Sequence, residues 1–218
     1  MVNRTFENGF DITAEMLKNS EEKKEQLSAF IKETVRNQFR KDGIIIGVSG
    51  GIDSAVIAAL CVEALGPERV FGLILPEKES SPSSSELGID LCRTLKIRYE
   101  EVPITPMLES FDIYSRKEAL IRELFPQYDP AVNTTSLSRP PMIAAEKVLN
   151  IPSLILLKDK KAISTKRLSA SQFFYVLSLQ NVKQRTRMIV EYQYAEKMNY
   201  AVCGTTNKTE FLTGFFVK

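Results

Sequence analysis

The stretch from Gly43 to Leu60, "GIIIGVSGGIDSAVIAAL", constrains the fold more than any other part of the chain. It begins with a short β-branched apolar run that ends at "SGG", which is typical of a buried strand in a parallel sheet. The continuation "DSAVIAALCVEAL" has a helical pattern and is followed by Gly66 and Pro67, which end helices. A buried strand, a glycine-rich turn and a helix in this order predict one βα unit.

The same alternation recurs along the chain. "VFGLIL" from Val70 is strand-like, "SPSSSELGIDLCRTL" has serine caps and a helical pattern, and "RYEEVPI" predicts a third strand. Near the end, a long helix from Asn181 leads to the strand "YAVCGTT". We therefore predict an α/β fold with a doubly wound, four-stranded parallel sheet, Rossmann-like and three-layered (α/β/α).

Two further segments complete the predicted organisation. Ser20 is a good N-cap for the amphipathic stretch "EEKKEQLSAFIKETVRNQFR", which predicts a helix against the sheet. Residues from about 106 to 180 interrupt the alternation with a turn-rich stretch, a predicted hairpin "SLILLKDKKAIS" and a helix "SASQFFYVLSL". We expect one domain over residues 1–218 with this insertion at its functional edge, where a lid, a dimer contact and simple decoration are all open.

Composition narrows the chemistry. The chain has no histidine, which excludes Ser/His/Asp and Cys/His catalysis and mixed Cys/His metal sites. Cys61, Cys92 and Cys203 lie far apart and are expected to be buried, reduced thiols. With 29 basic and 27 acidic residues, the charge does not favour nucleic acid, and the basic run 158–167 is interpreted as a solvated turn. Because the N-terminus lacks an apolar signal core and no long apolar run exists, we expect a cytoplasmic protein without membrane contact.

The loop "SGGIDS" has the composition of a phosphate site. Gly50 and Gly51 let backbone amides approach oxygen atoms, and the hydroxyls of Ser49 and Ser54 can add donors. A helix that starts here contributes roughly half a positive charge, and Asp53 in its first turn can hold a magnesium ion that bridges phosphates. The loop lacks the lysine of a Walker A motif and is not G-x-G-x-x-G, so γ-phosphate transfer and dinucleotide binding of the usual kind are disfavoured. The alternative is a tight turn in which Asp53 only caps the helix.

Three motifs in register resemble a known family. "VSGGIDSAVIAALCVEALG", "NVKQRTRM" and "CGTTNKTEFLTGFFVK" are similar to the N-type ATP pyrophosphatases of the adenine nucleotide alpha hydrolase-like superfamily, and within it to the ammonia-dependent NAD synthetases. The resemblance implies ATP-binding, metal-binding and substrate-binding positions. The ATP contacts would be Ser49, Gly50, Gly51, Ser54 and Thr205; the magnesium ligands Asp53 and Glu210; and the contacts to the dinucleotide substrate Arg185 and Lys218.

Each position carried over from the family also has an ordinary structural explanation. Arg185 presents a planar fork suited to phosphate or carboxylate, but a surface salt bridge would equally explain it. Thr205 follows an apolar strand, where open α/β sheets bind ligands, but it could be the N-cap of the helix at "NKTEF". Glu210 could be an ordinary surface carboxylate, and the sequence leaves these alternatives open.

The resemblance implies a ligase that joins ammonia to the carboxylate of nicotinic acid adenine dinucleotide. ATP as co-substrate would form an acyl adenylate with release of pyrophosphate, and ammonia would then displace AMP to give NAD. It also implies Mg²⁺, a homodimer, and ammonia that arrives free or from a separate partner. The family pattern continues beyond this point with a glycine- and aspartate-rich loop and a histidine and lysine pair. This chain ends at Lys218, so we expect the family's C-terminal part to be missing.

Two other functions fit the same residues. One is another adenylating member of the superfamily, such as an amide ligase or a tRNA-modifying enzyme with a different acceptor. The other is a non-catalytic nucleotide-binding protein that keeps the phosphate loop. The sequence has no CxxC pair and no strongly basic face, and both absences make the tRNA-modifying alternative less favoured.

Overall fold

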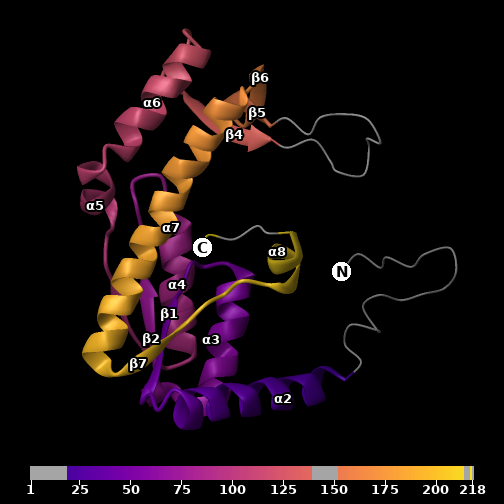
Figure 1. Cartoon of the computed structure of the whole chain (residues 1–218), viewed down its shortest axis with the longest axis vertical. Helices are drawn as coiled ribbons and strands as arrows, with labels where there is room; N and C mark the ends of the chain where they lie inside the picture. Colours follow the sequence, from indigo (N-terminus) through magenta and orange to yellow (C-terminus); the bar gives the residue numbers. More distant parts are fainter. Residues whose placement is uncertain (1–18, 139–151, 214–216, 218) are drawn as a thin grey trace, which may run out of the picture. The chain divides into compact units, whose positions relative to one another are not determined.

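The computed structural model describes residues 19–138, 152–213 and 217, and these form two compact units (Figure 1). Of the described residues, the first unit comprises 19–103 and 187–213, and the second comprises 104–138, 152–186 and Val217. The elements of the first unit are α2 (Ser20–Glu33), η1 (Thr34–Gln38), β1 (Gly43–Gly47), α3 (Ile52–Leu65), η2 (Pro67–Arg69), β2 (Val70–Ile74), α4 (Pro82–Thr94), β3 (Arg98–Glu101), β7 (Tyr200–Cys203) and α8 (Lys208–Thr213). The second unit contains α5 (Thr105–Ser110), α6 (Ile113–Leu124), β4 (Asn133–Ser138), β5 (Ser153–Lys158) and β6 (Lys161–Arg167), and α7 (Ala170–Met198) begins in it and ends in the first.

The sheet of the first unit has the predicted doubly wound topology. Its strand order is β3-β2-β1-β7, and every neighbouring pair is parallel. Ile44 of β1 is in register with Val70 on one side and with Ala201 on the other. The chain therefore winds outward from β1 through β2 to β3 and returns on the opposite side at β7, as the alternation of elements indicated.

Helices cover both faces of this sheet, which confirms the layered α/β prediction. On one face, a buried cluster joins strand side chains such as Ile44 and Ile46 to α3, α4 and η1. On the other face, the ring of Phe71 stacks on the ring of Tyr194 of α7, with 5.9 Å between the ring centroids. Since β1 is buried between the two layers, its isoleucines are almost completely inaccessible, and each contributes roughly 1.5–3 kcal/mol of hydrophobic stabilisation.

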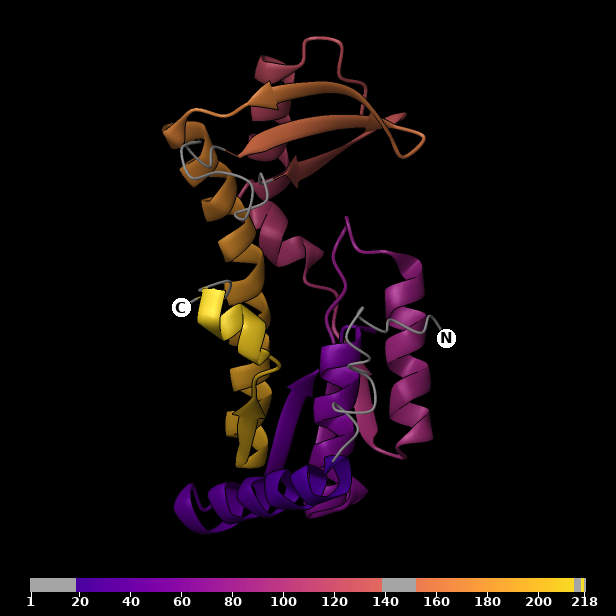
Figure 2. The same cartoon turned by 90° about the vertical axis from the view of Figure 1, so that its right-hand side faces the viewer.

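The second unit is built around a three-stranded antiparallel sheet in the order β4-β5-β6 (Figure 2). β5 and β6 form the predicted hairpin, whose two turn residues, Asp159 and Lys160, both have positive φ. That geometry is typical of the tight hairpin turn that matches strand twist. Its core consists of Phe125, Leu154, Leu156 and their neighbours on α6 and α7.

Four local predictions differ from the structure. Ser20 is the first helical residue of α2 rather than its cap, because Asn19 takes the left-handed conformation that precedes the helix. The two helices expected around position 180 are one continuous helix of 29 residues, α7. The turn-rich stretch before position 139 contains strand β4, which pairs with β5. Finally, Cys61 and Cys92 are buried reduced thiols as predicted, but Cys203 is only half-buried.

Among the described residues, no helix is both long and apolar enough to cross a membrane.

Candidate functional site

The loops after β1 and β7 meet at the point where the winding of the sheet reverses. β1 lies between β2 and β7, so the chain leaves β1 for one side and returns on the other. In open α/β sheets, ligands bind outside the carboxyl ends of the strands at this point. The loop "SGGIDS" follows β1 directly, and the loop 204–207 follows β7.

The serines of the first loop hold its shape. Ser54 is buried, and its Oγ donates to the carbonyl of Gly51 at 3.0 Å and accepts the N–H of Ser49 at 3.3 Å. Ser49 Oγ lies 3.1 Å from Ser54 Oγ and accepts the N–H of Gly51 at 3.3 Å. The loop is therefore held by its own hydroxyls, which is a form of preorganisation that a binding site needs.

The two glycines of the loop are small for different reasons. Gly50 has φ +76°, and a Cβ there would collide with the carbonyl of Ser84 at the start of α4. Gly51 has ordinary extended dihedrals, and a Cβ there would meet only the Ser49 hydroxyl, at 3.3 Å. Folding thus requires glycine at position 50, whereas at position 51 its absent side chain leaves the backbone open to a ligand.

The helix that leaves this loop presents an anion-binding end. α3 begins at Ile52 with Gly51 as its N-cap, and no side chain caps it. Its first-turn N–H groups have no partner within the helix, and they carry the positive end of the helix dipole. Asp53 lies in this first turn with an exposed side chain.

The second loop is joined to the first through Asn207. Asn207 Oδ1 accepts the N–H of Glu210 at 2.9 Å, and the N–H of Asn207 donates to Glu210 Oε2 at 3.0 Å. This reciprocal pair is a capping box, so the cap of α8 is Asn207 and not Thr205. Asn207 Nδ2 also donates to Asp53 Oδ1 at 3.2 Å. The two predicted metal ligands, Asp53 and Glu210, therefore hydrogen-bond to the same residue.

These two carboxylates suit a hard cation that takes most of its ligands from water and from substrate phosphates. Within residues 19–138, 152–213 and 217, no three His, Cys, Asp or Glu side chains form a group that could hold a metal by themselves. Mg²⁺ is usually held by one or two carboxylates together with substrate phosphates and water. Asp53 and Glu210 supply this kind of donor set beside an anion-binding helix end.

A third carboxylate lies buried at the same end of β1. Glu191 of α7 is 8% exposed, and its Oε1 fills the space in which Gly47 lacks a side chain. Burial raises the pKa of Glu191 from 4.5 to about 7, although the nearby positive charge of Arg187 lowers it. Sequence reasoning missed this residue, because a glutamate on a long helix is normally exposed.

Two thiols lie in contact beside this region. Cys61 Sγ of α3 donates to Cys203 Sγ at the end of β7, with 3.9 Å between the sulfur atoms. This hydrogen bond lowers the pKa of Cys203 and raises that of Cys61, and burial raises the pKa of Cys61 further.

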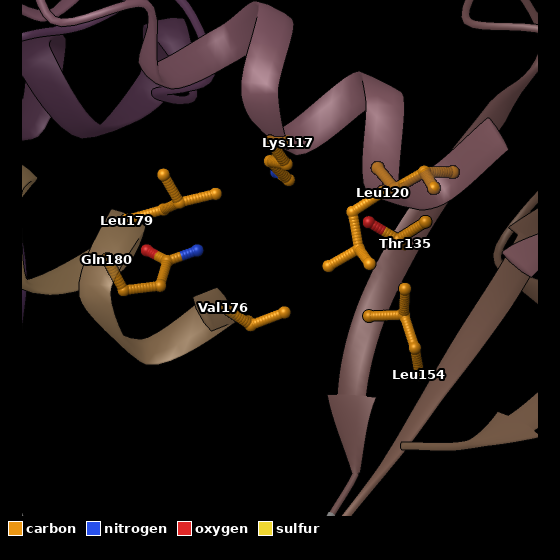
Figure 3. A pocket seen from close by; sticks show the side chains of 8 residues that line it. Lys117, Leu120, Thr135, Leu154, Val176, Leu179 and Gln180 are labelled. Atoms are coloured by element: carbon orange, nitrogen blue, oxygen red, sulfur yellow. The ribbon is translucent and has the colours of Figure 1, made fainter. Parts of the chain in front are cut away.

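The structure does not test the two predicted substrate contacts. Arg185 is an exposed residue of α7 within the second unit, and Lys218 lies outside the described residues. Thr205 is half-buried in the loop after β7. The hollow in the second unit, shown in Figure 3, contains none of the predicted site residues and is mostly apolar. Its lining includes Lys117, Leu120, Thr135, Leu154, Val176 and Gln180.

Sequence reasoning also missed Asn207, although its signal was readable. The segment "NKTE" has the N-x-x-E pattern of a capping box. The contact from Asn207 to Asp53 crosses 154 positions in sequence, so only the folded chain reveals it.

A doubly wound sheet with a preorganised phosphate-type loop at its switch point is typical of the Rossmann-like class of nucleotide-binding proteins. The family model described as NAD synthase matches residues 23–126 and 141–218. The chain therefore belongs to the NAD synthase family.

Curated relatives agree with this assignment. The NH(3)-dependent NAD(+) synthetase of Thermotoga maritima is 40% identical over 195 residues, which cover 89% of this chain and 63% of that protein. The enzyme of the same name from Rhizobium meliloti is 39% identical over 184 residues, covering 82% of this chain and 53% of that protein. The chain thus spans about three fifths of the length of curated relatives that it matches.

Solved structures support the fold. An NH3-dependent NAD synthetase from Campylobacter jejuni, in complex with the nitrate ion, has a TM-score of 0.57 and 26% identity. The match covers 90% of this chain and 61% of that one. The NMN synthetase of Francisella tularensis has a TM-score of 0.59 at 23% identity, which shows a shared fold only.

Proposed function

We propose that this chain catalyses the ATP-dependent amidation of nicotinic acid adenine dinucleotide by ammonia, giving NAD, AMP and pyrophosphate. The observation that carries the proposal is the junction of Asp53, Asn207 and Glu210 beside the glycine-rich loop, at the switch point of the sheet. Family membership and relatives named as NH(3)-dependent NAD(+) synthetases support the choice of reaction. The activity belongs to a single synthetase domain, residues 1–218, with its insertion at about 106–180.

In this mechanism, the protein positions the reactants and balances phosphate charge. The amides of the loop around Gly50 and Gly51 and the N-terminus of α3 bind the ATP phosphates, with Ser49, Ser54 and Thr205 around them. The substrate carboxylate then attacks the α-phosphorus, the bond from the α-phosphorus to the bridging oxygen of pyrophosphate breaks, and an acyl adenylate forms. Ammonia attacks the acyl carbon, AMP leaves with the bonding electrons, and the nitrogen loses one proton to water to give the amide. No protein nucleophile takes part, in keeping with a chain that has no histidine.

Asp53 and Glu210 would hold Mg²⁺ in this site. When bound, the ion supplies positive charge that stabilises the departing pyrophosphate. Arg185 and Lys218 would bind the dinucleotide, because their cationic groups match phosphate and carboxylate. Ammonia arrives free or from a separate partner that supplies it.

The protein would act as a cytoplasmic homodimer. Ile189 and Tyr192 lie one turn apart on α7 and are 64% and 54% exposed, which suits an apolar contact between copies. Sedimentation velocity tests this part of the proposal, and a monomer at micromolar concentration would contradict it.

The direct test incubates the chain with ATP, Mg²⁺, ammonium and deamido-NAD and measures NAD, AMP and pyrophosphate by chromatography. We expect the three products in equal amounts. AMP without NAD would identify a different acceptor, and ATP binding without turnover would identify a nucleotide-binding protein instead. Either result would overturn the proposal.

A further inference from the structure

Asn207 makes three hydrogen bonds at the point where the two loops of the site meet. Its Oδ1 and its N–H form the capping box with Glu210, and its Nδ2 donates to Asp53 Oδ1 (3.2 Å). The side chain comes from the loop after β7, whereas Asp53 belongs to the helix after β1. One half-buried amide therefore connects the two sides of the switch point.

The orientation of this amide is fixed by chemistry on both of its ends. Its oxygen faces the N–H of Glu210, which can only donate, and its nitrogen faces the carboxylate of Asp53. A flipped amide would lose the cap of α8 and turn its oxygen toward a carboxylate oxygen. Both hydrogen bonds thus require the same rotamer, and the cap holds Asn207 in place for Asp53.

Asp53 has an exposed side chain with its own rotamer freedom. The described residues give its carboxylate one hydrogen bond, from Asn207. The N–H of the same Asn207 donates to Glu210 Oε2, so Asn207 also holds the side chain of Glu210 in place. The relative placement of two carboxylates that are 157 positions apart in sequence therefore depends on one asparagine.

We propose that Asn207 is a positioning residue for the divalent-cation site, and that its amide sets Asp53 and Glu210 as a matched pair for metal-bound ATP. The inference rests on the proposed function, because it assigns these two carboxylates to Mg²⁺. Groups that orient metal ligands typically change metal affinity or activity 10–100-fold when they are mutated.

The chain contains a matched control at the opposite edge of the same sheet. Asn199 Nδ2, just before β7, donates to Asp42 Oδ2, just before β1, at 2.8 Å. It is the same pair of residue types, joining the same two strands, but at the amino ends. Asn199→Ser removes that bond without touching the proposed site.

The experiment compares Asn207→Ser with Asn199→Ser. Serine is as good an N-cap as asparagine, so Asn207→Ser keeps the cap of α8 but is too short to reach Asp53. For each protein, the Kd of a non-hydrolysable ATP analogue is measured by calorimetry with Mn²⁺ and with EDTA, and urea unfolding checks the fold. The readout is the ratio of the two constants, which is the gain in affinity that the metal provides.

We expect Asn207→Ser to reduce this gain about tenfold while leaving binding in EDTA unchanged, and Asn199→Ser to leave the gain within about twofold of wild type. A crystal structure of Asn207→Ser should show Asp53 in a different rotamer. If wild type gains affinity from Mn²⁺ and Asn207→Ser gains it equally, this inference is overturned and the proposed function stands. If wild type binds no ATP analogue, or gains nothing from the metal, the proposed site itself fails and the inference with it.

Discussion

The two edges of the parallel sheet in the first unit each join an asparagine to an aspartate, but in opposite electrostatic surroundings. At the amino edge, Asp42 accepts a hydrogen bond from Asn199 (2.8 Å), and Arg36 lies 3.8 Å from the Asp42 carboxylate. Lys41 donates to the same asparagine at 3.1 Å. The negative charge at this edge is therefore accompanied by positive charge, as in an ordinary surface network.

At the carboxyl edge, negative charge accumulates. Asp53 hydrogen-bonds to Asn207, and the ion pairs among residues 19–138, 152–213 and 217 include none to Asp53. Glu210 and the buried Glu191 lie at the same edge. Two carboxylates therefore hydrogen-bond to one neutral asparagine here, and a third is buried at the same end of β1. A cluster of this kind is the sort of surrounding that a bound cation would stabilise.

The largest expected effect separates the two aspartates. Asp53→Ala should lower pyrophosphate release by about 100-fold or more, because it removes a proposed metal ligand beside the phosphate loop. Asp42→Ala should leave the rate unchanged and lower the unfolding free energy by less than about 1 kcal/mol, since its ion pair is exposed. Steady-state kinetics and urea unfolding measure both. If Asp53→Ala is still active, Asp53 is not a metal ligand, and the two aspartates do not differ in function.

The pH dependence of unfolding tests whether the buried carboxylate of Glu191 lowers the stability of the folded protein. Because burial raises its pKa from 4.5 to about 7, the folded state binds a proton that the unfolded state has lost between these values. The contribution of Glu191 to stability should be greatest below about pH 4.5 and should be lost as the pH rises to about 7. At about 1.4 kcal/mol for each pKa unit, the loss is on the order of 3 kcal/mol.

Glu191→Gln should abolish this part of the pH dependence and stabilise the protein at pH 8. Urea unfolding from pH 4.5 to 8 measures the effect. Glu196→Gln, an exposed position on the same helix, is the control and should keep the wild-type profile. Parallel profiles for wild type and Glu191→Gln would contradict the assignment.

The two loop glycines should separate folding from binding. Gly50→Ala places a side chain at positive φ against the Ser84 carbonyl and should lower the unfolding free energy by roughly 2 kcal/mol. Gly51→Ala should change stability by less than about 0.5 kcal/mol but weaken ATP binding about tenfold, because its Cβ enters the space left for phosphate. Thermal unfolding and calorimetry distinguish the two. If Gly51→Ala binds ATP as tightly as wild type, the loop is a tight turn and not a phosphate-binding site.

The smallest effect concerns the thiol at the carboxyl end of β7. The hydrogen bond from Cys61 lowers the pKa of Cys203, whereas burial raises that of Cys92 to about 11. Native protein at pH 8 should therefore be alkylated by iodoacetamide first at Cys203, as mass spectrometry of peptides would show. Glu191→Gln should speed this reaction slightly, because the Glu191 carboxylate opposes the thiolate. Faster labelling of Cys92 would contradict the proposed thiol pair.

Local sequence patterns predicted the first unit well because its strands and helices alternate along the chain in the order in which the sheet is wound. The run at Ile44–Ile46 could be identified as a buried strand since it is apolar on both sides, and both of its faces are indeed covered. The pattern failed where two signals compete. Ser20 is a good cap by composition, but Asn19 tolerates the left-handed backbone that starts α2, and strand β4 forms within turn-forming residues because β5 pairs with it. The two helices expected around position 180 are one helix, because α7 runs without interruption from the second unit into the first.

The sequence by itself determined the winding of the sheet, the position of the phosphate-type loop and the resemblance to a family, because these depend on contiguous residues with strong local preferences. Tertiary structure decided which carboxylates lie at the carboxyl end of the sheet. Asp53 and Glu210 are connected through Asn207, and Glu191 is buried against Gly47, because β7 returns beside β1 and α7 covers the second face of the sheet. Such contacts join residues more than 140 positions apart, and no local pattern encodes them.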